Sequence, residues 1–159
     1  MYTGFMPIFD ARSETLILGS FPSVISREVG FYYGNKRNRF WGLMRRIYGE
    51  DFGESKEEKT EFLLKNRIAL WDAVVSCDIK GSLDADIKVH ASADLGIIFS
   101  VADIKRILCN GKKSYNLTVA AYGDLKAKIY YLPSTSPANA NFDEGAWTDI
   151  FNRIKAGEI

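Results

Sequence analysis

Four short apolar segments rich in β-favouring residues alternate along this chain with segments that repeat apolar residues at helical spacing. The β-favouring segments are residues 15–18, 67–75, 104–109 and 128–132. The helical patterns begin near residue 39 and then cover residues 54–66, 112–122 and 143–154. Such alternation predicts strands joined by crossover helices. We therefore predict an α/β fold, a three-layer α/β/α sandwich with a central, largely parallel four-stranded sheet.

The helix expected from Arg39 has the clearest amphipathic pattern. Its apolar positions follow the i, i+3, i+4, i+7 spacing of one helix face, namely Phe40, Leu43, Met44 and Ile47. Phe40 and Trp41 open this helix, so we assign both to the core. The segment that follows the strand at residues 67–75 is expected to be a loop over residues 76–82.

Size and charge suit one ordinary domain covering residues 1–159. The chain is 47% hydrophobic and 26% charged, and no linker or repeat divides it. Its 21 basic and 20 acidic residues balance, so a nucleic-acid partner would need basic groups gathered locally. The start shows no signal-peptide pattern and no apolar run could span a bilayer, so we expect a cytoplasmic protein without a membrane partner. We also expect a monomer.

Several kinds of site lack support in the sequence. Cys77 and Cys109 are far apart and show no paired spacing, which argues against a disulfide framework. His90 is the single histidine and has no ligand-forming neighbours, so metal centres and Ser–His–Asp triads are disfavoured. Neither GxxxxGKS/T nor GxGxxG occurs. We expect no metal and no nucleotide cofactor.

Ligands of parallel sheets bind beyond the carboxyl ends of the strands, which directs attention to the segments after each predicted strand. The first is a tight turn that offers hydroxyls, backbone donors and an aromatic face, made of Gly19, Ser20, Phe21, Pro22 and Ser23. Taken alone, these five residues fit an ordinary loop equally well. Trp71 and Asp72 end the neighbouring strand, where a carboxylate acts on a ligand or caps a loop.

A loop of about twenty residues separates the first strand from its helix, and loops that long are usually functional. Its sequence GFYYGNKRNRFW interleaves aromatic and basic residues, as unpaired nucleic acid requires. Phe31, Tyr32 and Tyr33 offer stacking surfaces. Phosphates could be bound by Lys36, Arg37 and Arg39. The amides of Asn35 and Asn38 are able to read a base or orient water. Local packing of the two tyrosines is the alternative.

The last strand leads into a loop of small polar residues between two prolines. These residues are Pro133, Ser134, Thr135, Ser136, Pro137, Ala138 and Asn139. Such a loop is stiff and carries free donors, which suits it to gripping a phosphate or pressing into a groove. A plain connector has the same composition. We favour the DNA-contacting interpretation because this loop and the first one leave the same edge of the sheet.

Taken together, these segments resemble the uracil-DNA glycosylase superfamily and, within it, the hypoxanthine-DNA (deoxyinosine) glycosylase branch. The shared motifs are LILGSFPS at 16–23, GFYYG at 30–34, RNRFW at 37–41, ALWD at 69–72 and SPANA at 136–140. They occur in order over nearly the whole chain. The resemblance implies a monofunctional DNA glycosylase of base excision repair. Its partner would be damaged DNA, and its substrate would be a flipped deaminated base, of which hypoxanthine is the one that the resemblance favours.

The resemblance also implies roles for residues. Asn38 matches the asparagine that acts in catalysis in the hypoxanthine branch. Residues 19–23, with Tyr33, Trp71 and Asp72, would bind the base, while Arg37, Arg39 and residues 134–139 would bind DNA. Other branches carry an acid or amide where this chain has Phe21, and the uracil branch has histidine in place of Leu132, which fits loss of strong uracil activity. Asn35 and Lys36 replace a common His–Pro pair.

Three alternatives remain open at this point. The chain fits a glycosylase for uracil, xanthine or another lesion within the same superfamily. It also fits a nucleic-acid-binding protein of the same fold without catalysis, because the usual acid and histidine are missing. A small-molecule α/β enzyme that uses the strand-end loops is disfavoured by the lack of a cofactor motif.

Overall fold

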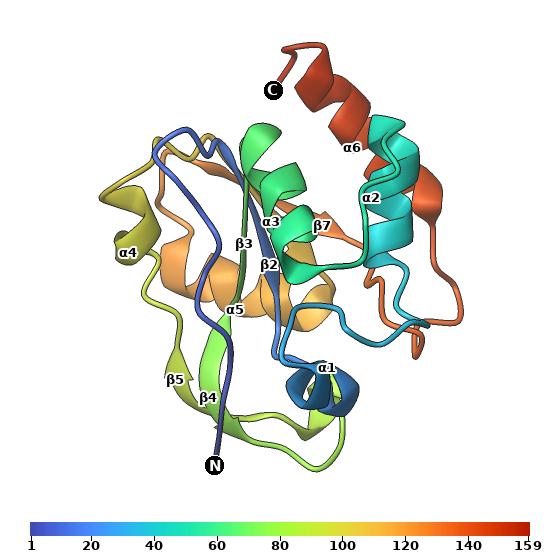
Figure 1. The fold of residues 1–159 in the computed structure, drawn as a ribbon. Coiled ribbons are helices and arrows are strands. Elements are labelled where there is room, and N and C mark those ends of the chain that lie inside the picture. The colour runs from blue at the N-terminus through green and yellow to red at the C-terminus, as the bar shows by residue number, and fades with distance from the viewer.

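Four parallel strands form the centre of the protein. The structure, a computed structural model, describes residues 1–159 except for the side chain of His90, so the expectation for that histidine lies outside the described residues. The strands are β2 (Thr15–Gly19), β3 (Ile68–Asp72), β6 (Arg106–Asn110) and β7 (Lys128–Leu132). Their order in the sheet is β3-β2-β6-β7, and every pairing is parallel. Figure 1 labels β3, β2 and β7 of this sheet. The predicted central sheet is confirmed.

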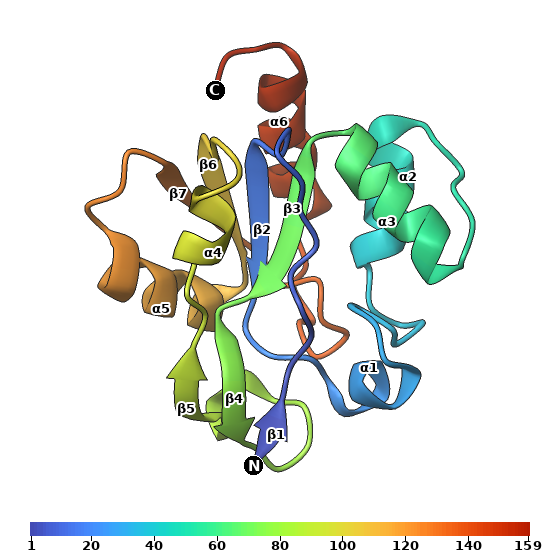
Figure 2. The ribbon, with the colours of Figure 1, turned by 60° about the vertical axis from the view of Figure 1, so that its left-hand side comes forward.

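Helices cover both faces of this sheet and give the predicted three layers (Figure 2). One layer contains α2 (Phe40–Tyr48), α3 (Lys56–Lys65) and α6 (Glu144–Lys155). The other contains α5 (Lys112–Tyr122) and the short α4 (Gly96–Phe99). All four helices expected from the sequence are present, with ends that differ from the predicted ones by at most two residues.

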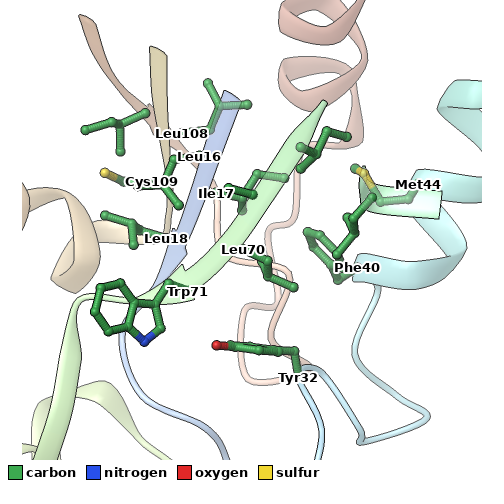
Figure 3. Packing of buried hydrophobic residues seen from close by; sticks show 14 of the residues in the cluster. Leu16, Ile17, Leu18, Tyr32, Phe40, Met44, Leu70, Trp71, Leu108 and Cys109 are labelled. Atoms are coloured by element: carbon green, nitrogen blue, oxygen red, sulfur yellow. The ribbon is translucent and has the colours of Figure 1, made fainter. Parts of the chain in front are cut away.

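The sheet's side chains alternate between the two layers, as the two-residue period of a strand requires. Figure 3 shows Ile17 and Leu70 facing Phe40 and Met44 of α2, while Leu18 and Trp71 lie on the opposite side. Phe40 and Trp41 are buried in the core, as predicted. No helix among the described residues is long and apolar enough to cross a membrane.

The structure corrects the prediction for residues 67–82. The strand does not run on to residue 75, because β3 ends at Asp72 and the chain enters a separate strand, β4 (Val74–Asp78), where a loop was expected from residue 76. β4 pairs antiparallel with β1 (Tyr2–Thr3) and β5 (Lys88–Ser92) in a second sheet of order β1-β4-β5. β1 comes from the start of the chain, and β5 pairs with β4 only after the connection at residues 79–87, so local sequence carries little sign of this sheet.

The long loop after β2 is also more ordered than predicted. It contains a short helix, α1 (Val24–Val29), whose first turn is capped by Ser23, since the Ser26 N–H donates to Ser23 Oγ over 3.1 Å. The helix ends at Gly30, where the backbone has a φ of 80° that favours glycine. A second short helix, η1 (Asp84–Asp86), lies between β4 and β5.

Candidate active site

A cavity of about 380 Å³ opens at the carboxyl ends of the parallel strands. This volume lies within the range of small-molecule sites. Many of the residues that line it were predicted from the sequence as site residues, namely Gly19, Ser20, Phe21, Pro22, Ser23, Tyr33, Asn38, Asp72, Ser134, Thr135, Ser136, Pro137, Ala138 and Asn139. The structure therefore brings the first turn, the long loop and the last loop together at one edge of the sheet.

Three neighbouring strand ends form the base of this cavity. Gly19 pairs with Asp72, and Leu18 pairs with Cys109, so Gly19 lies between Asp72 and Asn110 in one row. Side chains in one row of a sheet point to the same face. Gly19 is required there, because an added Cβ would collide with Asp72 Oδ1 and would lie 3.0 Å from the Tyr33 hydroxyl.

Trp71, which was predicted to bind the base, lies outside the cavity. Trp71 immediately precedes Asp72 and so points to the other face of the sheet, where its buried indole Nε1 donates to Phe5 O over 3.1 Å. Trp71 is therefore part of the core and does not line the cavity. Leu132, at the position of the uracil branch's histidine, is buried at the end of β7.

Asp72 has the most perturbed carboxyl of the site. Only 5% of its surface is exposed, and its Oδ2 has no hydrogen-bond partner among the described residues. Burial, assisted by the charge of Asp84, raises the pKa of Asp72 to about 7. A neutral carboxylic acid is thus accessible in the cavity near neutral pH.

Asp84 also lines the cavity and belongs to η1, in the connection between β4 and β5. The Ser20 hydroxyl donates a hydrogen bond to Asp84 Oδ1. The preceding turn is held to α1, since the Val24 N–H donates to Ser82 Oγ over 2.9 Å and Arg27 Nη2 donates to Gly81 O over 3.0 Å. Sequence reasoning missed Asp84, because the loop predicted in this region covered residues 76–82 and no motif was recognised beyond it.

Asn110 is the second residue of the site that the sequence interpretation missed. Its Nδ2 donates to the Tyr33 hydroxyl over 3.1 Å and to Thr135 Oγ1 over 3.0 Å, and its Oδ1 accepts from the Thr135 N–H over 3.0 Å. One buried amide thereby joins the long loop to the last loop. Its place directly after a buried strand, like that of Asp72, was the available signal.

The two tyrosines of the long loop are both held by protein contacts. Tyr32 is buried in the core, and its hydroxyl donates to Met6 O over 2.6 Å. Tyr33 has a φ of 51° and stacks on Phe40 with ring centroids 4.3 Å apart. Burial raises the pKa of both hydroxyls, so they stay protonated at physiological pH. Each lines the cavity while packed against other residues.

Asn38 lies where the long loop enters α2. Its Oδ1 accepts from the Phe40 N–H over 2.9 Å, and its own N–H donates to Asn35 O over 2.8 Å. The first turn of α2 therefore fixes the orientation of the amide at the cavity wall. The amide carbonyl retains its second lone pair for a ligand, and the amino group keeps its donors.

Curated relatives match nearly the whole chain. A hypoxanthine DNA glycosylase from Methanosarcina barkeri is 36% identical over 157 residues, which cover 94% of this chain and 98% of that protein. The chain belongs to the hypoxanthine DNA glycosylase family. A second hypoxanthine DNA glycosylase, from Methanosarcina acetivorans, is 35% identical and covers 93% of this chain and 96% of its own length. No protein-family model matches the chain.

The fold agrees with this membership of the hypoxanthine DNA glycosylase family. The solution NMR structure of a candidate uracil DNA glycosylase from Methanosarcina acetivorans superimposes with a TM-score of 0.81 at 32% identity. The match covers 96% of this chain and 98% of that one. The predicted resemblance to the uracil-DNA glycosylase superfamily is confirmed by these comparisons.

In this member of the hypoxanthine DNA glycosylase family, the loop after β7 is braced from within. Asn139 Nδ2 donates to Ser134 O over 3.0 Å, and the Asn139 N–H donates to Ser136 O over 3.0 Å. Thr135 is fully buried, so it anchors the loop to Asn110 and is not exposed to solvent. The exposed tip of the loop is Ala138.

Arg39 and Arg37, which the sequence placed together as phosphate-binding groups, have different surroundings. Arg39 Nη1 donates to Ser136 O over 2.9 Å, and its guanidinium lies 4.9 Å from the ring centroid of Phe142. Arg39 thus supports the loop after β7. Arg37 is exposed, and among the described residues none forms an ion pair with its guanidinium.

A basic groove of about 900 Å³ adjoins the cavity of this hypoxanthine DNA glycosylase relative and shares Tyr33, Asn35 and Asn38 with it. The groove contains seven basic residues and one acidic residue: Lys36, Arg37, Arg39, Arg45, Arg46, Lys56, Lys59 and Glu54. Arg45 and Lys59 are paired with Glu54, and Arg46 is paired with Glu144. The other four basic residues supply the local positive charge that the overall composition lacks. Among the described side chains, no group of three or more His, Cys, Asp or Glu residues could hold a metal ion.

Proposed function

We propose that this protein removes hypoxanthine from deoxyinosine in DNA as a monofunctional glycosylase of base excision repair. The observation that carries the proposal is the cavity at the strand ends, whose wall contains Asn38 and whose mouth adjoins a basic groove. Curated relatives that match over nearly the full length bear the name hypoxanthine DNA glycosylase. A base in a duplex cannot reach such a cavity, so the nucleotide must rotate out of the stack.

The proposed DNA path uses the groove and the loop after β7. Exposed Lys36 and Arg37 would contact phosphates, with affinity that falls as salt increases. The loop tip at Pro137 and Ala138 would press against the duplex beside the flipped nucleotide. Rotating the nucleotide out of the stack costs roughly a few kcal/mol in lost stacking and pairing, and this cost is lowest for a mispaired base such as hypoxanthine.

Asn38 is the proposed catalytic residue. Breaking the N-glycosidic bond leaves positive charge on the sugar and negative charge on the departing base. An amide cannot act as a general base, so Asn38 would orient the attacking water or support the cationic sugar through its fixed carbonyl. The remaining stabilisation must come from groups that face the base.

The test is the rate of base release from a panel of oligonucleotides that each contain one lesion. We expect release of hypoxanthine from inosine-containing duplexes to exceed release of uracil and xanthine, scored as strand cleavage at the abasic product. Asn38→Ala should lower the rate by about 100-fold or more while DNA binding survives. Asn116→Ala is the matched control, because Asn116 is exposed on α5, a helix that contributes no residue to the cavity wall.

Two outcomes would redirect the proposal. Preferred release of uracil or xanthine would keep the enzyme class and change its substrate. Binding to every duplex with no abasic product would instead indicate a DNA-binding protein without catalysis. We further propose that the enzyme acts as a monomer inside the cell, where its DNA substrate lies; size-exclusion chromatography tests the oligomeric state.

A further inference from the structure

Asp72 is a buried acid of the cavity wall, and none of the described side chains forms an ion pair with it. Its Oδ2 lacks a hydrogen-bond partner among the described residues, although the side chain lines the cavity. No lysine or arginine among the described side chains contributes to its electrostatic surroundings. Buried polar groups are nearly always paired, so an unpaired one in a cavity indicates a group kept free for a ligand.

The surroundings of Asp72 favour its neutral form. Asp84 from η1 raises the pKa of Asp72, and Asp72 in turn raises the pKa of Tyr32 and of Tyr33 in the long loop. Both tyrosines are neutral, because burial raises the pKa of each hydroxyl. Burial raises the pKa of Asp72 to about 7 and the Asp84 charge adds to this effect, so below that pH the carboxyl keeps its proton.

A neutral acid suits the proposed reaction and a carboxylate does not. Hypoxanthine presents a carbonyl oxygen beside a ring N–H, and the departing base gains negative charge. A carboxylic acid presents one donor beside one acceptor, which matches that edge, whereas a carboxylate has acceptors only. A carboxylate would also repel the developing negative charge, while an O–H aimed at the carbonyl oxygen stabilises it.

We propose that Asp72 binds the flipped base as a neutral carboxylic acid, with its O–H donating to the base carbonyl oxygen and its C=O accepting from the adjacent ring N–H. This inference rests on the proposed function and deepens it. Asp72 keeps its proton throughout. The bond between the sugar C1′ and the base breaks, the water oxygen bonds to C1′, and the proton released from water ends on the departing base.

The opposite role makes the opposite prediction. If Asp72 instead accepted a proton from the attacking water, its ionised form would be active and the rate would rise with pH. An asparagine at this position would then be inactive at every pH. As a reader of the base, the neutral acid resembles an asparagine amide, which also presents one donor and one acceptor.

The experiment measures single-turnover release of hypoxanthine from an inosine-containing duplex between about pH 5.5 and about pH 9. We expect the wild-type rate to fall about tenfold per pH unit above the Asp72 midpoint, the slope of a one-proton titration. Asp72→Asn should stay within about tenfold of the wild type at low pH and lose this alkaline fall. Asp72→Ala should be about 100-fold slower than the maximal wild-type rate and should show no alkaline fall. Asp103→Asn, an exposed site remote from the cavity, should keep the wild-type profile.

Other results overturn the inference. An inactive but folded Asp72→Asn variant, or a wild-type rate that rises through neutral pH, would assign the ionised form. If the Asp72 variants fail to fold, the ¹³C carboxyl shift of Asp72 in the wild type decides, because a midpoint near 4 instead of 7 contradicts the inference. Failure of the wild type to release hypoxanthine at any pH would contradict the proposed function itself.

Discussion

The side chain of Asn110 forms two hydrogen bonds with Thr135 at the cavity edge, one with its backbone and one with its hydroxyl. Asn110 Oδ1 accepts from the Thr135 N–H over 3.0 Å, and Asn110 Nδ2 donates to Thr135 Oγ1 over 3.0 Å. Because the same Nδ2 reaches the Tyr33 hydroxyl, this amide sets the distance between the two loops that form opposite cavity walls. Its loss should therefore affect stability and catalysis together.

We expect Asn110→Ala to lower the free energy of unfolding by about 2–3 kcal/mol, since it leaves the buried N–H of Thr135 without an acceptor. Base release should slow by about tenfold or more as the loops lose their relative position. Urea unfolding and single-turnover kinetics measure the two effects. Asn116→Ala, at an exposed position of α5, is the control. A stable and fully active Asn110→Ala variant would contradict the assigned role of the Asn110 amide.

Gly19→Ala tests the crowding at the middle of the row of strand ends. The new Cβ would collide with Asp72 Oδ1 and meet the Tyr33 hydroxyl at 3.0 Å. We expect a loss of about 1–3 kcal/mol in unfolding free energy, together with loss of base release. Gly42→Ala in α2 should instead raise stability by up to about 1 kcal/mol, because alanine favours helices and only the end of Arg46 lies near. Equal stability changes in both variants would show that the space beside Gly19 is not restricted.

The sequence allowed prediction of the four central strands and of the edge where the site lies. The pattern TLIL followed by Gly19 placed a buried strand and its turn correctly, because both signals are local. Asn110 was overlooked, because it was taken only as the residue that ends the predicted strand at residues 104–109. The loop that it binds, which contains Thr135, was identified from the sequence. The prediction that Trp71 lines the base-binding site was wrong for a different reason. Neighbouring residues of a strand point to opposite faces, so only one of Trp71 and Asp72 can line the cavity.

The contribution of Asp84 could not be predicted, because it depends on the second sheet. β4 and β5 pair over a connection that turns η1 toward Ser20, and no local pattern specifies that pairing. For the same reason, the raised pKa of Asp72 could not be predicted from the sequence. The residue was identified at a strand end, yet its burial depends on the long loop and on η1.

The raised pKa of Asp72 predicts how stability depends on pH. Burial raises the pKa from 3.8 to about 7, so the folded protein holds a proton that the unfolded chain releases in this window. The free energy of unfolding should therefore fall as pH rises from about 4 to about 7. Asp72→Asn should remove this fall and be more stable than the wild type by at most about 4 kcal/mol near pH 8.

Urea unfolding at a series of pH values measures this difference. Asp103→Asn, at an exposed site, should follow the wild-type dependence and serves as the control. A constant stability difference between Asp72→Asn and the wild type across the window would show that the carboxyl titrates at its ordinary pKa in the folded protein.

Asp84 should tune the pH dependence of activity through its charge on Asp72. Asp84→Asn can retain the hydrogen bond from Ser20 while removing that charge, which lowers the pKa of Asp72. We expect the alkaline fall in base release to begin at lower pH, by less than about one pH unit. Asp86→Asn, two residues along and exposed, should leave the profile in place. A shift to higher pH would contradict the electrostatic coupling.

Arg37 and Arg39 should differ in how they affect DNA binding, because only Arg37 is free to contact phosphate. Removing one phosphate contact lowers the slope of log affinity against log salt by about one. We expect this change for Arg37→Ala, with equal loss of affinity for damaged and undamaged duplexes. Arg39→Ala should leave the slope unchanged and slow base release, since its guanidinium supports Ser136 O and packs over Phe142.

Fluorescence anisotropy over a range of salt concentrations separates the two arginines. Lys126→Ala, on an exposed residue just before β7 and outside the basic groove, is the control for loss of one positive charge. If Arg37→Ala and Lys126→Ala change the slope equally, overall charge rather than the groove governs binding. If Arg39→Ala lowers the slope by about one, its guanidinium leaves Ser136 on binding and contacts the DNA backbone instead.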